Sequence, residues 1–309
     1  MPTQDLNQVV TNPQQLSAEE AYKVEQYWTP DMMESAEPIP LPTVYMPQHL
    51  LRLLDQSAEV LSDEASPIVS ESVPPDIDDA VPTSANFNTR LVPDLTQYPY
   101  AVVGKWFMTF AGRNFVGTGW VIGERTVFTA GHCVFDRNSA GWATNVLFRA
   151  QFNNGAQVGE WALPSLASLR GWTENEDFVY DMAMGVAARP IRPVTGKAGY
   201  IANVGQIQGQ IKSIGYPAEV IPGFDFNGRR MWECDGTYID TQNQIMAMNN
   251  NMTGGCSGGP GMYRQSDRLY AIWVNSFRFR SEPNILRSPY FGRGFTNLIQ
   301  WMRDNGGDS

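Results

Sequence analysis

The chain has 309 residues, enough for one large domain or two smaller ones with a substantial core. Its 42% hydrophobic and 12% aromatic content is that of a globular protein. No apolar run is long enough to predict a membrane-spanning helix, and the first residues carry neither the basic start nor the apolar stretch of a secretory signal. The net charge is −10 and the basic residues form no concentrated patch, which argues against a nucleic-acid partner.

The acidic residues are concentrated near the N-terminus. Residues 1–85 hold 15 acidic and two basic side chains, a formal charge of −13, whereas residues 86–309 hold 17 acidic and 20 basic side chains, a charge of +3. An acidic segment joined to a mildly basic body predicts a tail, a mask or a pro-region. The alternative interpretation is a disordered arm that only aids solubility.

The N-terminal segment contains few predicted elements. Ser17, with Glu20 three residues later, forms a capping-box pattern and predicts a short helix that runs to Trp28. Several prolines then interrupt the chain, and a weak second helix is predicted at residues 50–54. Residues 62–88 are rich in Ser, Pro, Asp, Glu and Ala, have little to bury, and are predicted to be a linker.

From about residue 91 the pattern changes to short runs rich in β-branched and aromatic residues, separated by Gly, Asn and Pro. Many short strands with frequent turns predict an all-β protein. The clearest runs are residues 101–107, 119–122, 126–129, 145–148, 211–214, 236–239 and 269–274. The last element differs, because residues 296–305 carry apolar side chains at helical spacing and end before Gly306, which predicts a terminal helix.

Cysteine and histidine are scarce. The three cysteines, Cys133, Cys234 and Cys256, allow at most one internal disulfide. The two histidines, His49 and His132, belong to no Cys/His cluster with metal-ligand spacing. We therefore expect neither a metal nor another cofactor.

His132 is the single histidine of the body. It lies in a short turn of small residues, TAGHC (residues 129–133), directly after an apolar β run. Histidine is the usual base that accepts the proton of a hydroxyl nucleophile. A lone histidine is more often structural than catalytic, and here the flanking motif favours the catalytic role.

Asp181 stands at the head of an apolar, strand-like run, YDMAM (residues 180–184). A buried carboxylate at such a position is suited to orient an imidazole and to stabilise its cation. Asp177 competes for this role, but the acidic cluster around it (residues 174–177) is typical of a solvated loop.

Ser257 lies in a glycine-rich loop, GGCSGGP (residues 254–260). Glycine lets the backbone adopt unusual angles and approach a ligand closely. Acyl transfer needs such a loop, since the nucleophile must be exposed and backbone N–H groups, here those of Gly255 and Ser257, must converge on the developing oxyanion. Taken alone, the loop fits a glycine-rich turn equally well.

These segments occur in the order His, Asp, Ser, and TAGHC, DMA and GCSGGP resemble the three signature segments of trypsin-like serine peptidases. A closer resemblance is to the bacterial and fungal glutamyl endopeptidases. It rests on GYP (residues 215–217), MWE (231–233), MTGG (252–255), YAI (270–272) and the terminal helix, and it covers residues 91–305.

The resemblance implies two six-stranded antiparallel β-barrels with a C-terminal α-helix, the first barrel over residues 91–195 and the second over 196–309. It implies that His132, Asp181 and Ser257 form a triad in the cleft between the barrels, and that the protein is a serine endopeptidase of polypeptides. We expect a secreted monomer with no nucleic-acid or membrane partner.

The same resemblance extends to the acidic segment. YWTPDM (residues 27–32) is similar to pro-region segments of secreted relatives, which favours residues 1–90 as a partly disordered pro-segment of a latent precursor. We expect the cut between about Ser84 and Leu91, with Arg90 as a site for a trypsin-like activator.

The chain departs from the family at the residue before the nucleophile. Trypsin has an aspartate there that pairs with the new N-terminus upon activation, whereas this chain has Cys256. In the family the segments that hold Cys234 and Cys256 belong to the same barrel. The resemblance therefore implies a Cys234–Cys256 disulfide that anchors the loop and leaves Cys133 free, and such a bridge would favour an exported protein.

The second departure concerns the substrate pocket. Glutamyl endopeptidases use a histidine on the strand after the serine to help bind the substrate carboxylate, and the matching residue is identified as Trp273. Asn275 stands where the family has a pocket-lining glycine, and Thr253 is retained. We expect Thr253, Trp273 and Asn275 to line the pocket without a strong preference for glutamate, unless Arg278 or Arg280 reaches back to supply a charge.

Two other interpretations stay open. The loop GGCSG (residues 254–258) can be read one residue out of register, which makes Cys256 the nucleophile, as in chymotrypsin-fold cysteine peptidases. A catalytically silent binding module on the same fold is the second alternative, because fold alone does not fix function.

Overall fold

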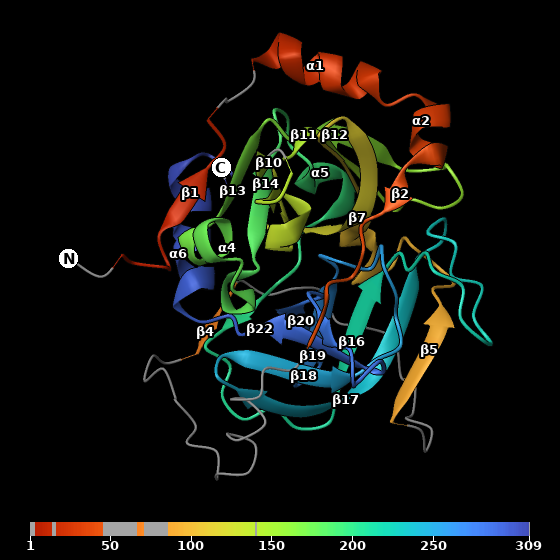
Figure 1. The fold of residues 1–309 in the computed structure, drawn as a ribbon, viewed down its shortest axis with the longest axis vertical. Helices are drawn as coiled ribbons and strands as arrows, with labels where there is room; N and C mark the ends of the chain where they lie inside the picture. The colour runs from red at the N-terminus through yellow and green to blue at the C-terminus, as the bar shows by residue number, and fades with distance from the viewer. Residues whose placement is uncertain (1–3, 14–16, 46–66, 71–85, 140, 309) are drawn as a thin grey trace.

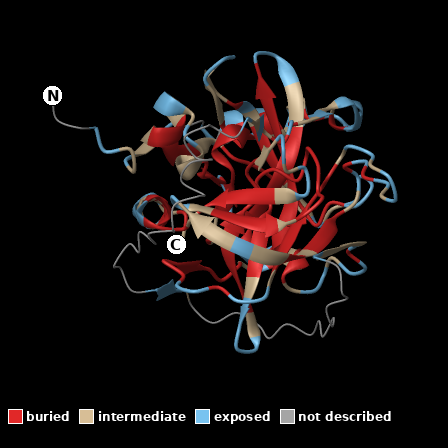
Figure 2. Ribbon diagram, turned by 60° about the horizontal axis from the view of Figure 1, so that its bottom comes forward, coloured by how far each residue is buried: buried red, intermediate tan, exposed pale blue. Residues whose placement is uncertain are grey.

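The computed structural model describes residues 4–13, 17–45, 67–70, 86–139 and 141–308. Two curled antiparallel sheets make up the body, the first in the upper half of Figure 1 and the second in the lower half. Buried residues fill the centre of both sheets, and exposed residues lie mainly in loops and in the N-terminal segment (Figure 2). None of the described helices is both long and apolar enough to cross a membrane.

The first sheet takes its body strands in the order β13-β14-β8-β7-β6-β11-β12. Large aromatic side chains, among them Trp106, Trp120 and Phe128, are fully buried within it and supply most of the apolar area that stabilises this half. The strands are β6 (Val103–Phe110), β7 (Arg113–Val121), β8 (Thr126–Thr129), β11 (Thr144–Ala150), β12 (Gly159–Ala162), β13 (Ser165–Leu169) and β14 (Ala183–Val186).

The second sheet has the order β20-β19-β16-β17-β18-β22. Its apolar cluster includes Trp273, Met252 and Cys256, all fully buried. The strands are β16 (Gln210–Gly215), β17 (Trp232–Gln242), β18 (Ile245–Asn249), β19 (Pro260–Gln265), β20 (Arg268–Val274) and β22 (Ile285–Pro289).

Short elements connect and cover the sheets. The terminal helix α6 (Arg293–Asp304) buries Leu298, Ile299 and Met302 against the first half, as the helical spacing predicts. The other short elements are α4 (Arg170–Asn175), α5 (Arg192–Thr195), the 3-10 turns η1 (Tyr100–Val102), η2 (Gly131–Cys133) and η3 (Phe178–Tyr180), and the strands β9 (Phe135–Asp136), β10 (Gly141–Trp142), β15 (Ile201–Ala202) and β21 (Arg278–Phe279). The predicted all-β class with two curled sheets and a C-terminal helix is confirmed.

The described parts of the acidic segment are ordered and wrap around the body (Figure 1). Their elements are β1 (Val9–Thr11), α1 (Ala18–Tyr27), α2 (Pro30–Ser35), β2 (Glu37–Pro38), β3 (Thr43–Val44) and β4 (Ile68–Val69), and β1 pairs with β13 while β4 pairs with β15. The predicted helix begins at its Ser17 capping box as expected. The weak helix predicted at residues 50–54 lies outside the described residues.

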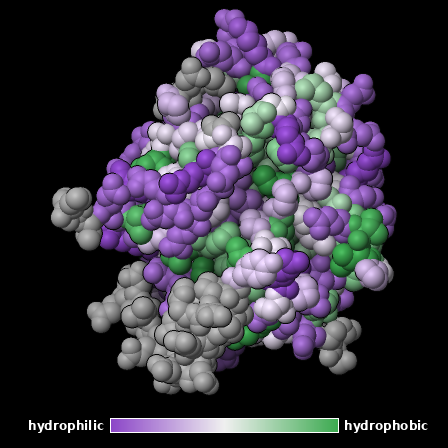
Figure 3. All heavy atoms as spheres, viewed as in Figure 1, coloured by the Kyte–Doolittle hydropathy of each residue, from purple (hydrophilic) through white to green (hydrophobic). Residues whose placement is uncertain are grey.

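One aromatic residue anchors this segment to the first sheet. Trp28 is 3% exposed, its indole N–H donates to the Asn145 carbonyl at 2.6 Å, and its ring lies 5.2 Å from that of Phe107. Glu19 and Glu20 in the first turn of the helix before it are exposed, and the corresponding face at the top of the space-filling view is hydrophilic (Figure 3). The described residues of this segment are therefore not a free arm, because burying a Trp side chain favours docking by about 2–3 kcal/mol.

The end of the predicted pro-segment belongs to the second sheet. β5 (Phe87–Leu91) pairs with β17, and Arg90 forms an ion pair of 2.5 Å with Glu233, which is 1% exposed and also bound by Lys212 at 2.7 Å. Removing one partner of such a buried group leaves an uncompensated charge. The boundary expected between residues 90 and 91 therefore falls inside a strand that pairs with the second sheet.

Candidate active site

His132 is positioned by the end of β8. That strand stops at Thr129, and the 3-10 turn η2 then places the imidazole, 8% exposed, between the two sheets. Gly131 cannot be replaced by a larger residue without movement, because a Cβ there would lie 2.8 Å from the Trp172 ring and 2.9 Å from Asp181 Oδ1. The small residues of the TAGHC turn thus let the carboxylate approach the backbone closely.

Asp181 reaches His132 because β14, which follows it, pairs with β8. Its Oδ1 accepts the His132 backbone N–H at 2.7 Å, and its Oδ2 lies 2.9 Å from His132 Nδ1. The carboxylate is fully buried. Asp177, the competing acid, instead accepts the Val179 N–H at 3.0 Å and caps η3, so it behaves as the loop residue that the sequence indicates.

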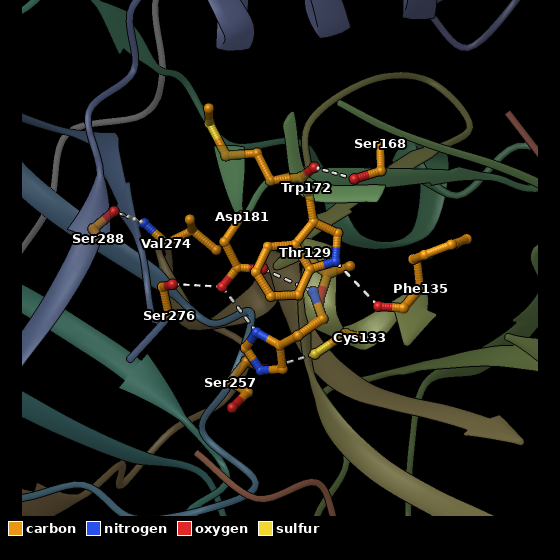
Figure 4. A network of polar contacts seen from close by, with 12 residues as sticks. Thr129, Cys133, Phe135, Ser168, Trp172, Asp181, Ser257, Val274, Ser276 and Ser288 are labelled. Atoms are coloured by element: carbon orange, nitrogen blue, oxygen red, sulfur yellow. Dashed lines mark hydrogen bonds and ion pairs between the residues drawn. The ribbon is translucent and has the colours of Figure 1, made fainter. Parts of the chain in front are cut away.

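Ser276 is a partner that the sequence reasoning did not identify. Its hydroxyl donates a short hydrogen bond to Oδ2 of Asp181, and the side chains of Asp181, Ser276 and Ser257 converge from separate segments in Figure 4. The residue directly follows β20 and Asn275. Its position next to the pocket strand is the only sequence signal that could have suggested this role.

The electrostatics of the pair favour a charged imidazole. Burial opposes the imidazolium, but the Asp181 carboxylate more than offsets this effect, so the pKa of His132 is raised above its ordinary value. In the neutral tautomer Nδ1–H is assigned to the carboxylate, so Nε2 is the nitrogen that accepts a proton, and the raised pKa favours that acceptance. His132 Nε2 is buried and has no hydrogen-bond partner among the described residues.

The loop that carries Ser257 depends on glycine at two positions. Gly255 and Gly258 have φ of 90° and 85°, and a Cβ on Gly258 would lie 2.0 Å from Thr129 Oγ1. The loop is tied to the first sheet by the Thr118 N–H, which donates to the Ser257 carbonyl at 2.8 Å. The Ser257 hydroxyl, like His132 Nε2, is buried and lacks a hydrogen-bond partner in the described part of the chain.

The structure does not contain the expected disulfide. Cys133, Cys234 and Cys256 are free and buried. The bridge was expected because Cys234 and Cys256 belong to the same half of the protein, but the Cys234 thiol contacts the Thr89 side chain and the Asn251 backbone instead. Membership of one sheet does not fix the direction of a side chain, and a disulfide needs both sulfurs to face each other.

Two of the three expected pocket residues are committed elsewhere. Trp273 is fully buried in the second cluster and donates to Asn275 Oδ1 at 3.0 Å. Asn275 Nδ2 donates to the Ile214 and Cys256 carbonyls at 3.2 and 3.1 Å, so this side chain braces the nucleophile loop instead of narrowing a pocket. Thr253, 7% exposed, exchanges hydrogen bonds with the Glu219 backbone.

Arg278 does fold back toward the nucleophile loop. Its guanidinium donates short hydrogen bonds to the Met252 and Pro283 carbonyls, while its Nε is buried without a partner among the described residues. No ion pair joins it to a carboxylate in the part of the chain that the structure describes. Burial lowers the pKa of Arg278, although the nearby Glu219 and Cys256 oppose this. A guanidinium stays charged in a protein, so a partly buried cation is bonded to the Met252 carbonyl, next to the nucleophile loop.

A strand of the acidic segment crosses the mouth of the site. The Gly255 N–H, one of the two expected oxyanion donors, donates to the Ile39 carbonyl at 3.1 Å. The described residues contain no group of three or more side chains that could hold a metal ion.

Comparisons with known proteins indicate the family of the chain. No protein-family model matches the chain. It is 27% identical over 223 residues to the glutamyl endopeptidase of Bacillus licheniformis, covering 68% of this chain and 66% of that relative. It is 30% identical over 94 residues to the extracellular metalloprotease of Bacillus subtilis, covering 29% of each. The chain thus spans just under two thirds of the first curated relative and less than a third of the second.

The similar solved structures are also proteases. The protease Anisep from Arthrobacter nicotinovorans is 30% identical, with a TM-score of 0.58 over 66% of this chain and 96% of that one. The thermostable serine protease AL20 from an extremophilic microorganism is 27% identical, with a TM-score of 0.57 over 65% and 96%. A Glu endopeptidase at 19% identity, with a TM-score of 0.60 over 70% and 96%, shares the fold.

The chain therefore belongs to the trypsin-like, chymotrypsin-fold serine peptidases. Within that family it lies near the glutamyl endopeptidase branch.

The state of the cysteines is directly measurable. Burial raises the pKa of Cys234 and of Cys256 to about 12 in each case, so at about pH 8 the reactive thiolate is almost absent. We expect iodoacetamide to leave both residues unmodified in the native protein and to alkylate all three cysteines after unfolding, as read by mass spectrometry. A Cys234–Cys256 peptide in a non-reducing digest would contradict the structure.

Proposed function

We propose that the protein is a serine endopeptidase that hydrolyses peptide bonds through an acyl-enzyme on Ser257. The observation that carries this proposal is the buried Asp181 carboxylate, which holds His132 by two hydrogen bonds, together with the lack of a hydrogen-bond partner for both His132 Nε2 and the Ser257 hydroxyl among the described residues. Two buried polar atoms without hydrogen-bond partners cost free energy of folding, so their presence is explained best by a function that needs both atoms free. Family membership is the second line of support.

In the proposed first step, Ser257 Oγ attacks the carbonyl carbon of the substrate while its proton moves to His132 Nε2. Asp181 holds the tautomer and stabilises the imidazolium that forms. The tetrahedral oxyanion then accepts hydrogen bonds from the Gly255 and Ser257 N–H groups. Collapse expels the amine, which takes the proton from His132, and water repeats the sequence on the acyl-enzyme.

The two alternative interpretations have less support. A nucleophile at Cys256 is disfavoured because this thiol is fully buried and burial raises its pKa to about 12, whereas a reactive cysteine needs a lowered pKa and access. A silent binding module is disfavoured because selection for binding alone gives no reason to maintain the buried Asp181–His132 pair next to an unbonded hydroxyl.

We propose that the chain is a latent precursor of an exported enzyme. Latency is supported by the ordered acidic segment and by the Ile39 carbonyl on the Gly255 N–H. Export is supported by a relative described as extracellular, and no longer by a disulfide. Because Arg90 pairs with the buried Glu233, the activating cut belongs before Phe87 and not after Arg90.

We also propose that Arg278 selects an acidic side chain on the acyl side of the cut bond. The expectation of weak glutamate preference rested on the loss of the family's pocket histidine, with Arg278 or Arg280 left as the possible source of charge, and on Trp273 and Asn275 as pocket walls, which are committed to other contacts. A partly buried guanidinium that has no ion pair with a carboxylate among the described residues is stabilised by a substrate that supplies one. The name of one relative, glutamyl endopeptidase, points the same way.

The nucleophile is tested by three substitutions. Ser257→Ala and His132→Ala should each lower kcat/KM for a peptide substrate by about 10⁴–10⁶-fold, the scale of triad removal. Cys256→Ala should lower kcat/KM far less, because the Ser257 hydroxyl and the two N–H groups that bind the oxyanion remain. An inactive Cys256→Ala together with an active Ser257→Ala would refute the serine mechanism.

Latency is tested by inserting a site for a sequence-specific protease between residues 71 and 85. The intact chain should react slowly with a fluorophosphonate probe, and the cut chain, freed of its N-terminal fragment by gel filtration, should react at least about tenfold faster. The natural active form should begin at or before Phe87 on N-terminal sequencing. Full activity from the uncut chain would contradict the proposal.

Specificity is tested with matched peptides that carry Glu, Gln, Arg, Phe, Leu or Ala before the cut bond. The cut enzyme should prefer Glu over Gln by about a hundredfold, equivalent to about 2.7 kcal/mol of differential binding. Arg278→Gln should abolish this ratio, whereas Arg280→Gln, a change at the neighbouring exposed arginine, should preserve it. A Glu-to-Gln ratio near one in the unmodified enzyme would restore the expectation of weak glutamate preference.

A further inference from the structure

Residues 37–45 of the acidic segment, here called the cleft strand, lie along the gap between the two sheets. Its first part pairs with β7, and the Ile39 N–H donates to the Val116 carbonyl at 2.8 Å. The Ile39 carbonyl then accepts from the Gly255 N–H. The strand therefore occupies one of the two donors that would stabilise the oxyanion.

The second part of the cleft strand pairs with the segment after the pocket strand. The Arg278 N–H donates to the Pro42 carbonyl at 3.0 Å, and the Arg280 N–H donates to the Val44 carbonyl at 2.9 Å. β3 and β21 form a short ladder as a result. Main-chain bonds on both sides of Ser257 thus hold the strand across the whole site, in the manner of strand addition to an open edge.

Two side chains of the cleft strand are buried in different halves of the body. Ile39 is 8% exposed and packs in the first apolar cluster. Leu41 is also 8% exposed but packs in the second cluster, which contains Met252 and Cys256 of the nucleophile loop. Leu41 lies between Ile39, which is hydrogen-bonded to Gly255, and Pro42, which is hydrogen-bonded to Arg278, so its buried side chain belongs to the part of the strand that runs past the nucleophile loop.

The direction of the cleft strand is opposite to that of a substrate. Arg278, proposed above to bind the side chain on the acyl side of the cut bond, lies in β21, and the acyl side of a peptide is its N-terminal part. Here the N-terminal part, β2, lies on β7, and the C-terminal part, β3, lies on β21, with both pairings parallel. The cleft strand therefore runs through the site in the opposite N-to-C direction to a substrate.

The peptide bond that the cleft strand presents is also a poor substrate. The carbonyl on the Gly255 N–H belongs to Ile39, and the next residue is Pro40, so the bond is a tertiary amide whose nitrogen belongs to the proline ring. Pro38, Pro40 and Pro42 alternate along the strand. Each proline fixes φ, which keeps the strand extended and lowers the entropy lost on docking.

We propose that the cleft strand is a built-in inhibitor that binds the active site in reverse, with Ile39 on an oxyanion donor and Leu41 buried beside the nucleophile loop. This inference rests on the proposed peptidase function and gives its latency a structural cause. Because the strand is reversed, the site cannot cut it in place, and release requires a second peptidase that acts elsewhere in the acidic segment.

The test uses the full, uncut chain and four versions of it: unmodified, Leu41→Ala, Leu41→Asp, and Tyr22→Asp as a matched control. Tyr22 lies on α1 of the same segment, is 60% exposed, and is far along the chain from the cleft strand. Fluorophosphonate labelling should accelerate at least about tenfold for Leu41→Ala and further for Leu41→Asp, since burial of the leucine holds the strand in place. Tyr22→Asp should label at the unmodified rate.

A second measurement does not depend on catalysis. In chains that carry Ser257→Ala, amide hydrogen exchange at Gly255, Arg278 and Arg280 should be slow in the unmodified segment and fast with Leu41→Asp, because these N–H groups donate to the cleft strand. Protection that is unaffected by Leu41→Asp would overturn the inference. Leu41→Asp could remove the amide protection in the Ser257→Ala chain and yet give no fluorophosphonate labelling in the chain that retains Ser257. That result would support the inference and refute the serine mechanism.

Discussion

The buried carboxylate of Asp181 is the group on which the rest of the site depends. A charge with no exposure is tolerated only when its lone pairs are satisfied, and this one accepts from the His132 backbone N–H, from the imidazole and from the Ser276 hydroxyl. These bonds join both halves of the protein, since His132 belongs to the first sheet and Ser276 follows the pocket strand of the second. The geometry at Ser257 is therefore set by a contact that forms only when the two sheets are packed together.

Local patterns predicted the elements and the reactive segments well. The seven apolar runs fall in or overlap strands, the capping box begins α1, and His132 and Asp181 are hydrogen-bonded to each other. Strand alternation, helix spacing and glycine at positive φ are short-range constraints, so the residues themselves carry them. The competing acid Asp177 was separated from Asp181 for the same reason, by its polar neighbours.

Features that depend on the direction of a side chain in space were predicted less well. Trp273 and Asn275 lie on the expected strand, but Trp273 points into the core and Asn275 braces the Cys256 carbonyl. Cys234 and Cys256 belong to the same apolar cluster but form no disulfide bond. The end of the acidic segment was placed at a change in composition, whereas the buried partner of Arg90, more than a hundred residues later in the sequence, decides where the body begins. A single sequence contains no record of such long-range pairings.

The attachment of the cleft strand to the same polypeptide determines how the site is controlled over time. An inhibitor on a separate chain dissociates when it is diluted, whereas a tethered one faces its site at a fixed effective concentration. The fraction of open sites is then independent of how much protein is present, and each molecule opens by a unimolecular step. Trp28, docked between Phe107 and the Asn145 carbonyl, shortens the tether further. Once the tether is cut and the fragment diffuses away, rebinding becomes bimolecular, so dilution alone makes the change effectively irreversible.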